Sequence, residues 1–171
     1  LGSMVARLTI GKEKYKGVEP LFQEKLEELE DLHKKLTNLV DEDANAFNGV
    51  IAAFKMPKDS DEEKKKRYQK IQEEYKKAAE VPMVTVQTCR KVFDILYELG
   101  TKGNKNAVSD IAVGALNAVT GVKSAALNVE INLPSIKDEA FTMKMQTGLK
   151  QSLKDLDTKV KEIINAAKAE F

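Results

Sequence analysis

The sequence predicts an all-α protein, a bundle of about five long helices around a buried central helix. Three observations lead to this prediction. Apolar residues recur in steps of three and four over long segments, which is the spacing of a helix face. Only 9 Gly and 4 Pro interrupt 171 residues. No segment shows a convincing strand alternation, because NVEINL (residues 128–133) is short and adjoins a helical pattern.

Length and charge exclude several classes of protein. A chain of 171 residues is expected to form one domain, residues 1–171, with a sizeable core. With 28 basic and 27 acidic residues, it is not expected to bind nucleic acid or a membrane surface. No run approaches the roughly 20 apolar residues of a membrane helix. The single cysteine, Cys89, excludes an internal disulfide framework, fits a cytoplasmic location, and is expected to pack in the core.

The first long helix is predicted over residues 18–55. Before it, residues 1–4 match a cloning remnant, because Gly2-Ser3 precedes Met4, or residues 1–10 match the last turns of an apolar helix. The predicted buried stripe of the long helix contains two polar residues, His33 and Asp43. Its members are Phe22, Leu26, Leu29, His33, Leu36, Val40, Asp43, Phe47, Val50 and Phe54. We assign His33 a structural or interfacial role, since it has no partners at metal-ligand spacing.

The next helices follow a turn at residues 56–61, where Asp59, Ser60 or Asp61 offers an N-cap. A polar helix begins there, and Pro82 either kinks it or starts a second helix before Gly100. After the central helix, Pro134 marks a break. A last amphipathic helix is predicted over residues 138–169.

The central helix is predicted within residues 103–133, which are small or apolar nearly all the way round. Such a helix is expected to be surrounded by protein. One stripe alternates small with polar residues: Asp110, Gly114, Asn117, Gly121, Ser124 and Asn128. We call this stripe the seam. Its small residues either let a ligand or another backbone come close, or merely allow tight packing of helices. In the second case, its side-chain amides form hydrogen bonds with neighbouring helices. The sequence leaves both interpretations open.

Asp43 is the sharpest candidate for chemistry, because its stripe is otherwise apolar there. A buried carboxylate either has a raised pKa or takes a dedicated partner, and both suit an acid or base. The alternative is a structural hydrogen bond to a neighbouring helix.

A second cluster surrounds the start of the central helix. It consists of Lys102, Asn104, Lys105, Asn106, Ser109 and Asp110. Lysines beside free backbone amides favour an anion. The alternative is a capping loop in which Asn106 or Ser109 closes the helix.

Six motifs in order resemble the C-terminal domain of the formiminotransferase-cyclodeaminase family, which includes free-standing cyclodeaminases and methenyltetrahydrofolate cyclohydrolases. They are LGSMVARLTIGKEKY, LVDEDANAF, AAFKMPK, VP at 81–82, GNKNAVSD and AALNVEINLPSIKDEAF. The resemblance covers residues 1 to about 145. It implies a helical bundle, usually a homodimer, and a catalytic role for Asp43 as the second aspartate of LVDEDANAF.

The resemblance further implies a folate substrate. The expected reaction is closure of 5-formiminotetrahydrofolate to 5,10-methenyltetrahydrofolate with loss of ammonia, a lyase reaction without metal or redox cofactor. The alternatives are the cyclohydrolase reaction and a non-catalytic helical oligomerisation module. Lys102 or Lys105 is expected to hold the glutamate tail. The other expected substrate contacts are Asn104, Asp110, Asn117, Asn128 and Asn132.

One difference from the family concerns the beginning of the chain. In the family, a glycine-rich loop and an apolar helix precede the LGSMV segment, and this sequence contains neither. We therefore expect residues 1–4 to be native sequence inside a helix, with the upstream part missing.

Overall fold

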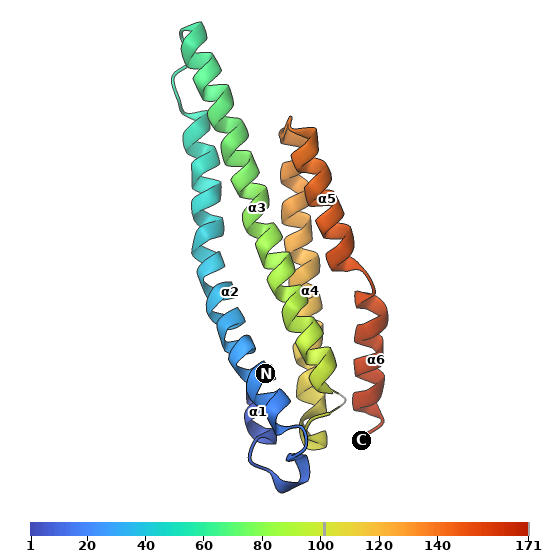
Figure 1. Cartoon of the computed structure of the whole chain (residues 1–171). Helices are drawn as coiled ribbons and strands as arrows, with labels where there is room; N and C mark the ends of the chain where they lie inside the picture. Colours follow the sequence, from blue (N-terminus) through green and yellow to red (C-terminus); the bar gives the residue numbers. More distant parts are fainter. Residues whose placement is uncertain (101, 171) are drawn as a thin grey trace.

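The computed structural model describes residues 1–100 and 102–170, and these form helices only, with no strand among them (Figure 1). The all-α prediction is confirmed, and five helices, α2 to α6, form the bundle. The α-helices are α1 (Gly2–Thr9), α2 (Glu19–Phe54), α3 (Asp61–Gly100), α4 (Val108–Asn132), α5 (Glu139–Leu153) and α6 (Leu156–Lys168). Short 3₁₀ turns η1 (Glu13–Tyr15), η2 (Lys105–Ala107) and η3 (Leu133–Ser135) lie between them. Within the described residues, no helix is long and apolar enough to cross a membrane.

Helix α3 organises the bundle, because it packs along α2 on one side and along α4 on the other. Helices α5 and α6 lie beside α3 and α4 on the side away from α2 (Figure 1). Helix α1 contacts both α2 and α4 at one end of the molecule. Residues 1–10 are thus part of the fold, with Val5 and Ala6 completely buried.

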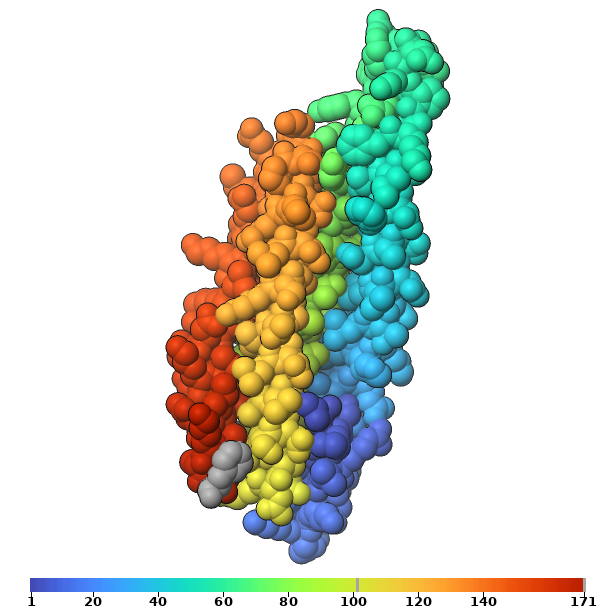
Figure 2. Space-filling view, turned by 180° about the vertical axis from the view of Figure 1, so that it is seen from behind, coloured from blue at the N-terminus to red at the C-terminus, as the bar shows by residue number. Residues whose placement is uncertain are grey.

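The prediction that residues 103–133 form a helix surrounded by protein is wrong for this chain. One face of α4 is buried, but its opposite face is open and apolar. The exposed side chains there are Val113, Leu116, Leu127 and Ile131, each 44–77% exposed. In the space-filling view from behind, α4 runs along the middle of the molecule with α1 and α2 beside it (Figure 2). Composition alone does not tell which face of such a helix has a neighbour in the same chain.

The buried stripe of α2 also differs from the predicted one. The buried residues Leu32, Leu39, Ala46 and Ala53 recur every seven positions. The predicted stripe repeats every seven positions as well, but half of it is displaced by one residue: His33, Val40, Phe47 and Phe54 are exposed, each directly after a buried residue. Asp43 is exposed as well.

Helix α3 is continuous through Pro82, so the alternative of two separate helices is wrong. Ser60 closes its beginning as predicted. The Ser60 hydroxyl accepts a hydrogen bond from the Glu63 amide at 3.2 Å, and the Glu63 carboxylate accepts one from the Ser60 amide at 2.9 Å. This reciprocal pair is a capping box.

The last predicted helix is broken into α5 and α6. Asp155 adopts a left-handed conformation with φ of 60°. Arg90 of α3 donates to the carbonyl oxygens of Ser152 at 3.0 Å and Lys154 at 2.6 Å. The sequence offers no Gly or Pro at this point, so the break depends on a side chain 62 residues away.

Candidate functional site

A cleft of about 410 Å³ lies over α3 between α2 and the end of α4. Helix α2 contributes Asp43, Phe47 and Val50, and α3 contributes Tyr75 and Ala78. The opposite wall consists of Asn128, Ile131 and Asn132 of α4 with Ser135 of η3. Three side chains singled out by the sequence, Asp43, Asn128 and Asn132, therefore meet in one place.

Asp43 is exposed, so its predicted burial is wrong. The predicted alternative, a structural hydrogen bond, is wrong too. Among residues 1–100 and 102–170, no side chain or backbone group forms a hydrogen bond or ion pair with the Asp43 carboxylate. Asp43 thus presents an unpaired carboxylate at the edge of a largely apolar cleft.

Asn132 is half-buried and anchored across the bundle. Its side-chain amide donates to the carbonyl oxygen of Ala78 on α3 at 3.0 Å and to that of Asn128 at 2.8 Å. Asn128 is exposed, and no described group pairs with its side-chain amide. The two asparagines thus differ: one is held in a single orientation, and the other is free to rotate.

The loop at the end of the cleft is fixed by a residue that the sequence did not single out. Gln72 donates to the carbonyl oxygen of Ser135 at 2.9 Å and accepts from the Lys137 amide at 2.8 Å. Lys76, one turn further along α3, forms an ion pair with Asp138 at 2.7 Å. A glutamine on a polar helix face carries no sequence signal for such a loop contact.

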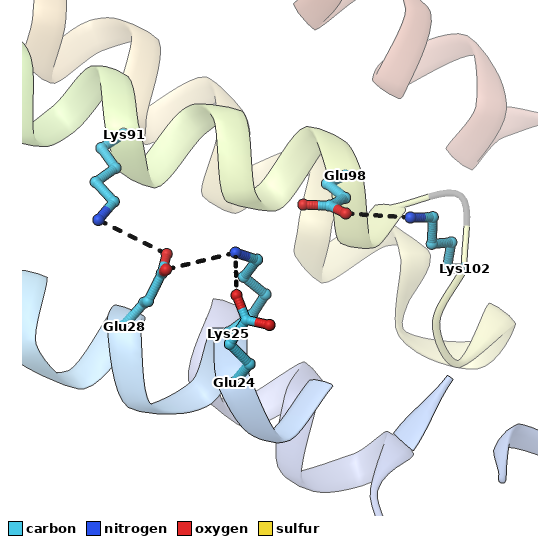
Figure 3. A network of polar contacts seen from close by, with 6 residues as sticks. All are labelled: Glu24, Lys25, Glu28, Lys91, Glu98 and Lys102. Atoms are coloured by element: carbon cyan, nitrogen blue, oxygen red, sulfur yellow. Dashed lines mark hydrogen bonds and ion pairs between the residues drawn. The ribbon is translucent and has the colours of Figure 1, made fainter. Parts of the chain in front are cut away.

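The second predicted cluster lies at the other end of α4. Asp110 and Asn132 are 22 residues apart on one helix, a rise of about 33 Å. Lys102 pairs with Glu98 at 3.1 Å (Figure 3). The same view shows Lys91 of α3 paired with Glu28 of α2, which also pairs with Lys25 of its own helix. Lys105 pairs with Glu170 at 2.6 Å. Within one chain, Lys102 and Lys105 do not reach the cleft.

The cluster does form a capping loop, as the alternative interpretation holds, but the residue that caps it is not one of the two predicted. Asn104 closes η2 by accepting a hydrogen bond from the Asn106 amide at 3.1 Å. No side chain in the described part of the chain caps helix α4 itself, so the expectation for Asn106 and Ser109 is wrong. Asn104 also donates to the carbonyl oxygen of Leu8 at 3.4 Å, which ties this loop to α1.

The small residues of the predicted seam serve helix packing. A Cβ atom at Gly121 would lie 2.8 Å from the sulfur of Cys89, and one at Gly114 would lie 3.2 Å from Leu96. Both contacts come from α3 side chains.

Cys89 is buried as predicted, and burial raises the pKa of its thiol. Asn117 is exposed and borders a separate cavity of about 320 Å³ near Leu1.

Metal ligands do not cluster in the part of the chain that is described: no three His, Cys, Asp or Glu side chains lie together. The expectation of a reaction without metal or cofactor remains a prediction.

Comparisons with known proteins identify the family and the fold. The profile of the Formiminotransferase-cyclodeaminase family matches residues 1–168. A methenyltetrahydrofolate cyclohydrolase of Methylorubrum extorquens is 40% identical over 97% of this chain and 81% of that protein. The formimidoyltransferase-cyclodeaminase of Sus scrofa is 32% identical over 99% of this chain, which spans 31% of that larger protein. The crystal structure of formiminotetrahydrofolate cyclodeaminase from Thermotoga maritima superposes with a TM-score of 0.80 and 28% identity, covering 98% of this chain and 80% of that one.

Proposed function

The chain belongs to the formiminotransferase-cyclodeaminase family, and we propose on this premise that it is a folate enzyme acting at the cleft between α2, α3 and α4. The proposed reaction closes 5-formiminotetrahydrofolate to 5,10-methenyltetrahydrofolate and releases ammonia. One observation carries the proposal: the unpaired carboxylate of Asp43 shares a cleft with the amides of Asn128 and Asn132.

Ring closure needs one group that moves a proton. N10 of the folate attacks the formimino carbon and must lose its proton as the new carbon–nitrogen bond forms. The amino group on that carbon must gain a proton before its bond breaks and ammonia leaves. Asp43 takes the first proton and delivers it to the leaving amine, so that one carboxylate serves as base and then as acid.

The cleft suits the flat pterin ring. Phe47, Val50 and Tyr75 offer apolar and aromatic surface for the ring faces. Asn128 and Asn132 offer polar atoms for the ring edge. We retain Asp110, Asn117 and Asn104 as predicted contacts of secondary importance, because they lie outside this cleft.

The cyclohydrolase reaction is the second candidate, and the 40% identity to the Methylorubrum extorquens protein favours it. Water would open the methenyl bridge to 10-formyltetrahydrofolate. Asp43 would then remove a proton from the attacking water. Both reactions use the same pterin and the same carboxylate.

Absorbance of the methenyl group distinguishes the two reactions. Its appearance from 5-formiminotetrahydrofolate supports the deaminase, and its accelerated loss from 5,10-methenyltetrahydrofolate supports the hydrolase. We expect Asp43→Asn to lower the rate of the active reaction by a factor on the order of a hundred to ten thousand. Asp41→Asn, an exposed aspartate on the same helix, is the matched control. Equal rates for Asp43→Asn and the wild type would remove Asp43 from the mechanism.

We also propose a homodimer. The exposed apolar face of α4 is the kind of surface that a second copy buries. A two-fold axis across the middle of α4 would bring Lys102 and Lys105 of one copy near the cleft of the other, where the glutamate tail projects. The free, buried thiol of Cys89 agrees with a cytoplasmic location.

Sedimentation equilibrium tests the dimer. A mass of about twice 19.0 kDa supports it, and a mass of one chain at micromolar concentration contradicts it. Leu127→Glu should shift the mass toward the monomer, because it places a charge in the proposed interface. Met143→Glu, an exposed apolar residue on α5, serves as the control.

A further inference from the structure

A proline in the middle of α3 leaves one carbonyl group without its helical partner. In an α-helix, the amide of residue 82 would donate to the carbonyl oxygen of residue 78. Pro82 has no N–H, so the Ala78 carbonyl receives no such bond. Pro82 is buried, and Ala78 lines the cleft. An unpaired carbonyl at such a position needs a donor from elsewhere.

Asn132 of α4 supplies that donor. Its side-chain nitrogen donates one hydrogen to the Ala78 oxygen at 3.0 Å and the other to the Asn128 oxygen at 2.8 Å. Carbonyl oxygens only accept, so the nitrogen must point at both of them and the amide has one orientation.

The remaining atom of this amide is its oxygen, Oδ1. No described group donates a hydrogen bond to it. Asn132 lines the cleft, and its anchored amide is an oriented hydrogen-bond acceptor, whereas an amide without these two anchors would rotate between acceptor and donor.

We propose that Pro82 is a positioning residue for the substrate. By leaving the Ala78 carbonyl free, it holds the Asn132 amide with its oxygen toward the cleft, where that oxygen accepts a hydrogen bond from the exocyclic amino group of the pterin. This inference rests on the proposed folate substrate, but it applies equally to the deaminase and hydrolase reactions.

The choice of the amino group follows from the chemistry of the ring. The reacting atoms N5 and N10 lie at the end of the pterin opposite the amino group. An acceptor that is not the proton-transfer group therefore suits the amino end. A fixed acceptor there selects an N–H donor and rejects a ring that carries a methyl group in its place.

The test compares two ligands and four proteins by calorimetry. The ligands are tetrahydrofolate and its analogue with a methyl group in place of the amino group. We expect the wild type to bind the analogue about tenfold more weakly, the effect of one lost hydrogen bond. Pro82→Ala restores a helical N–H donor that competes with Asn132 for the Ala78 oxygen and so weakens one of its two anchors. It should bind tetrahydrofolate about tenfold more weakly, lose no further affinity with the analogue, and raise KM more than it lowers kcat.

Two further variants separate positioning from a general effect on folding. Asn132→Ala should show the same pattern as Pro82→Ala, which keeps the test informative if Pro82→Ala does not fold. Val81→Ala, which keeps the proline, should discriminate between the ligands as the wild type does. Proline is the least favourable residue inside a helix, so Pro82→Ala is expected to unfold at a temperature no lower than the wild type.

The outcomes are distinct. Wild-type protein that binds both ligands equally, or Pro82→Ala and Asn132→Ala variants that keep the tenfold discrimination, would overturn the positioning role while leaving the proposed function intact. A wild type that converts neither folate substrate would overturn the proposed function and this inference with it.

Discussion

Glu74 is the clearest case of a buried charge in this molecule. Its side chain is only 8% exposed, and its carboxylate pairs with Lys70 and Lys77, each at 2.9 Å. Gly49 of α2 leaves the space that the carboxylate occupies, because a Cβ atom there would collide with it. The Lys77 hydrogen bond, followed by that of Lys70, lowers the pKa of Glu74 below its ordinary value of 4.5. This carboxylate is thus paired within α3 and packs against α2 at Gly49.

A lowered pKa makes this contact dependent on pH. The charged form is favoured in the folded state, so its contribution to stability is complete above pH 4.5 and is lost as the pH falls through the lower folded value. We expect Glu74→Gln to be less stable than the wild type at neutral pH, and the difference to shrink below about pH 4.5. Urea unfolding from pH 7 to 3 measures it. Glu73→Gln, an exposed neighbour, should show little difference throughout, and a pH-independent gap for Glu74→Gln would contradict the assignment.

Asp43 shows how much a sequence predicts at the scale of one residue. Its position in an otherwise apolar stripe singled it out, and it does lie at a cleft beside α4. The physical reason was wrong, since the side chain is exposed and not buried. The orientation of Asn132 was beyond prediction, because it depends on Ala78 and Pro82 of another helix.

At the scale of elements, the sequence predicts what local periodicity controls. The extent of α2, the beginning of α3 at Ser60 and the end of α4 near Pro134 all follow from apolar spacing and capping residues. The break between α5 and α6 does not, because no residue at the break favours it. It depends on Arg90, which supplies hydrogen bonds to carbonyl groups that the ended helix leaves unpaired.

At the scale of the molecule, the least predictable feature is how α4 is covered. Its small and apolar composition suggests burial on every side, but among the described residues α4 packs mainly against α3 and α6, with smaller contacts to α1, α5 and the adjoining turns η2 and η3. Its remaining apolar face and the two separated groups of polar candidates acquire a common explanation if two copies associate. Burial in an assembly and burial in a chain leave the same pattern in a sequence.

The most direct test of the account is a crystal structure of the chain with a stable reduced folate such as 5-formyltetrahydrofolate. The account predicts the pterin ring in the cleft between α2, α3 and α4, with Asp43 within hydrogen-bonding distance of the substituent on N5 or of N10. The amino group of the pterin should lie within hydrogen-bonding distance of Asn132 Oδ1. A folate bound elsewhere, with the cleft empty, would contradict it.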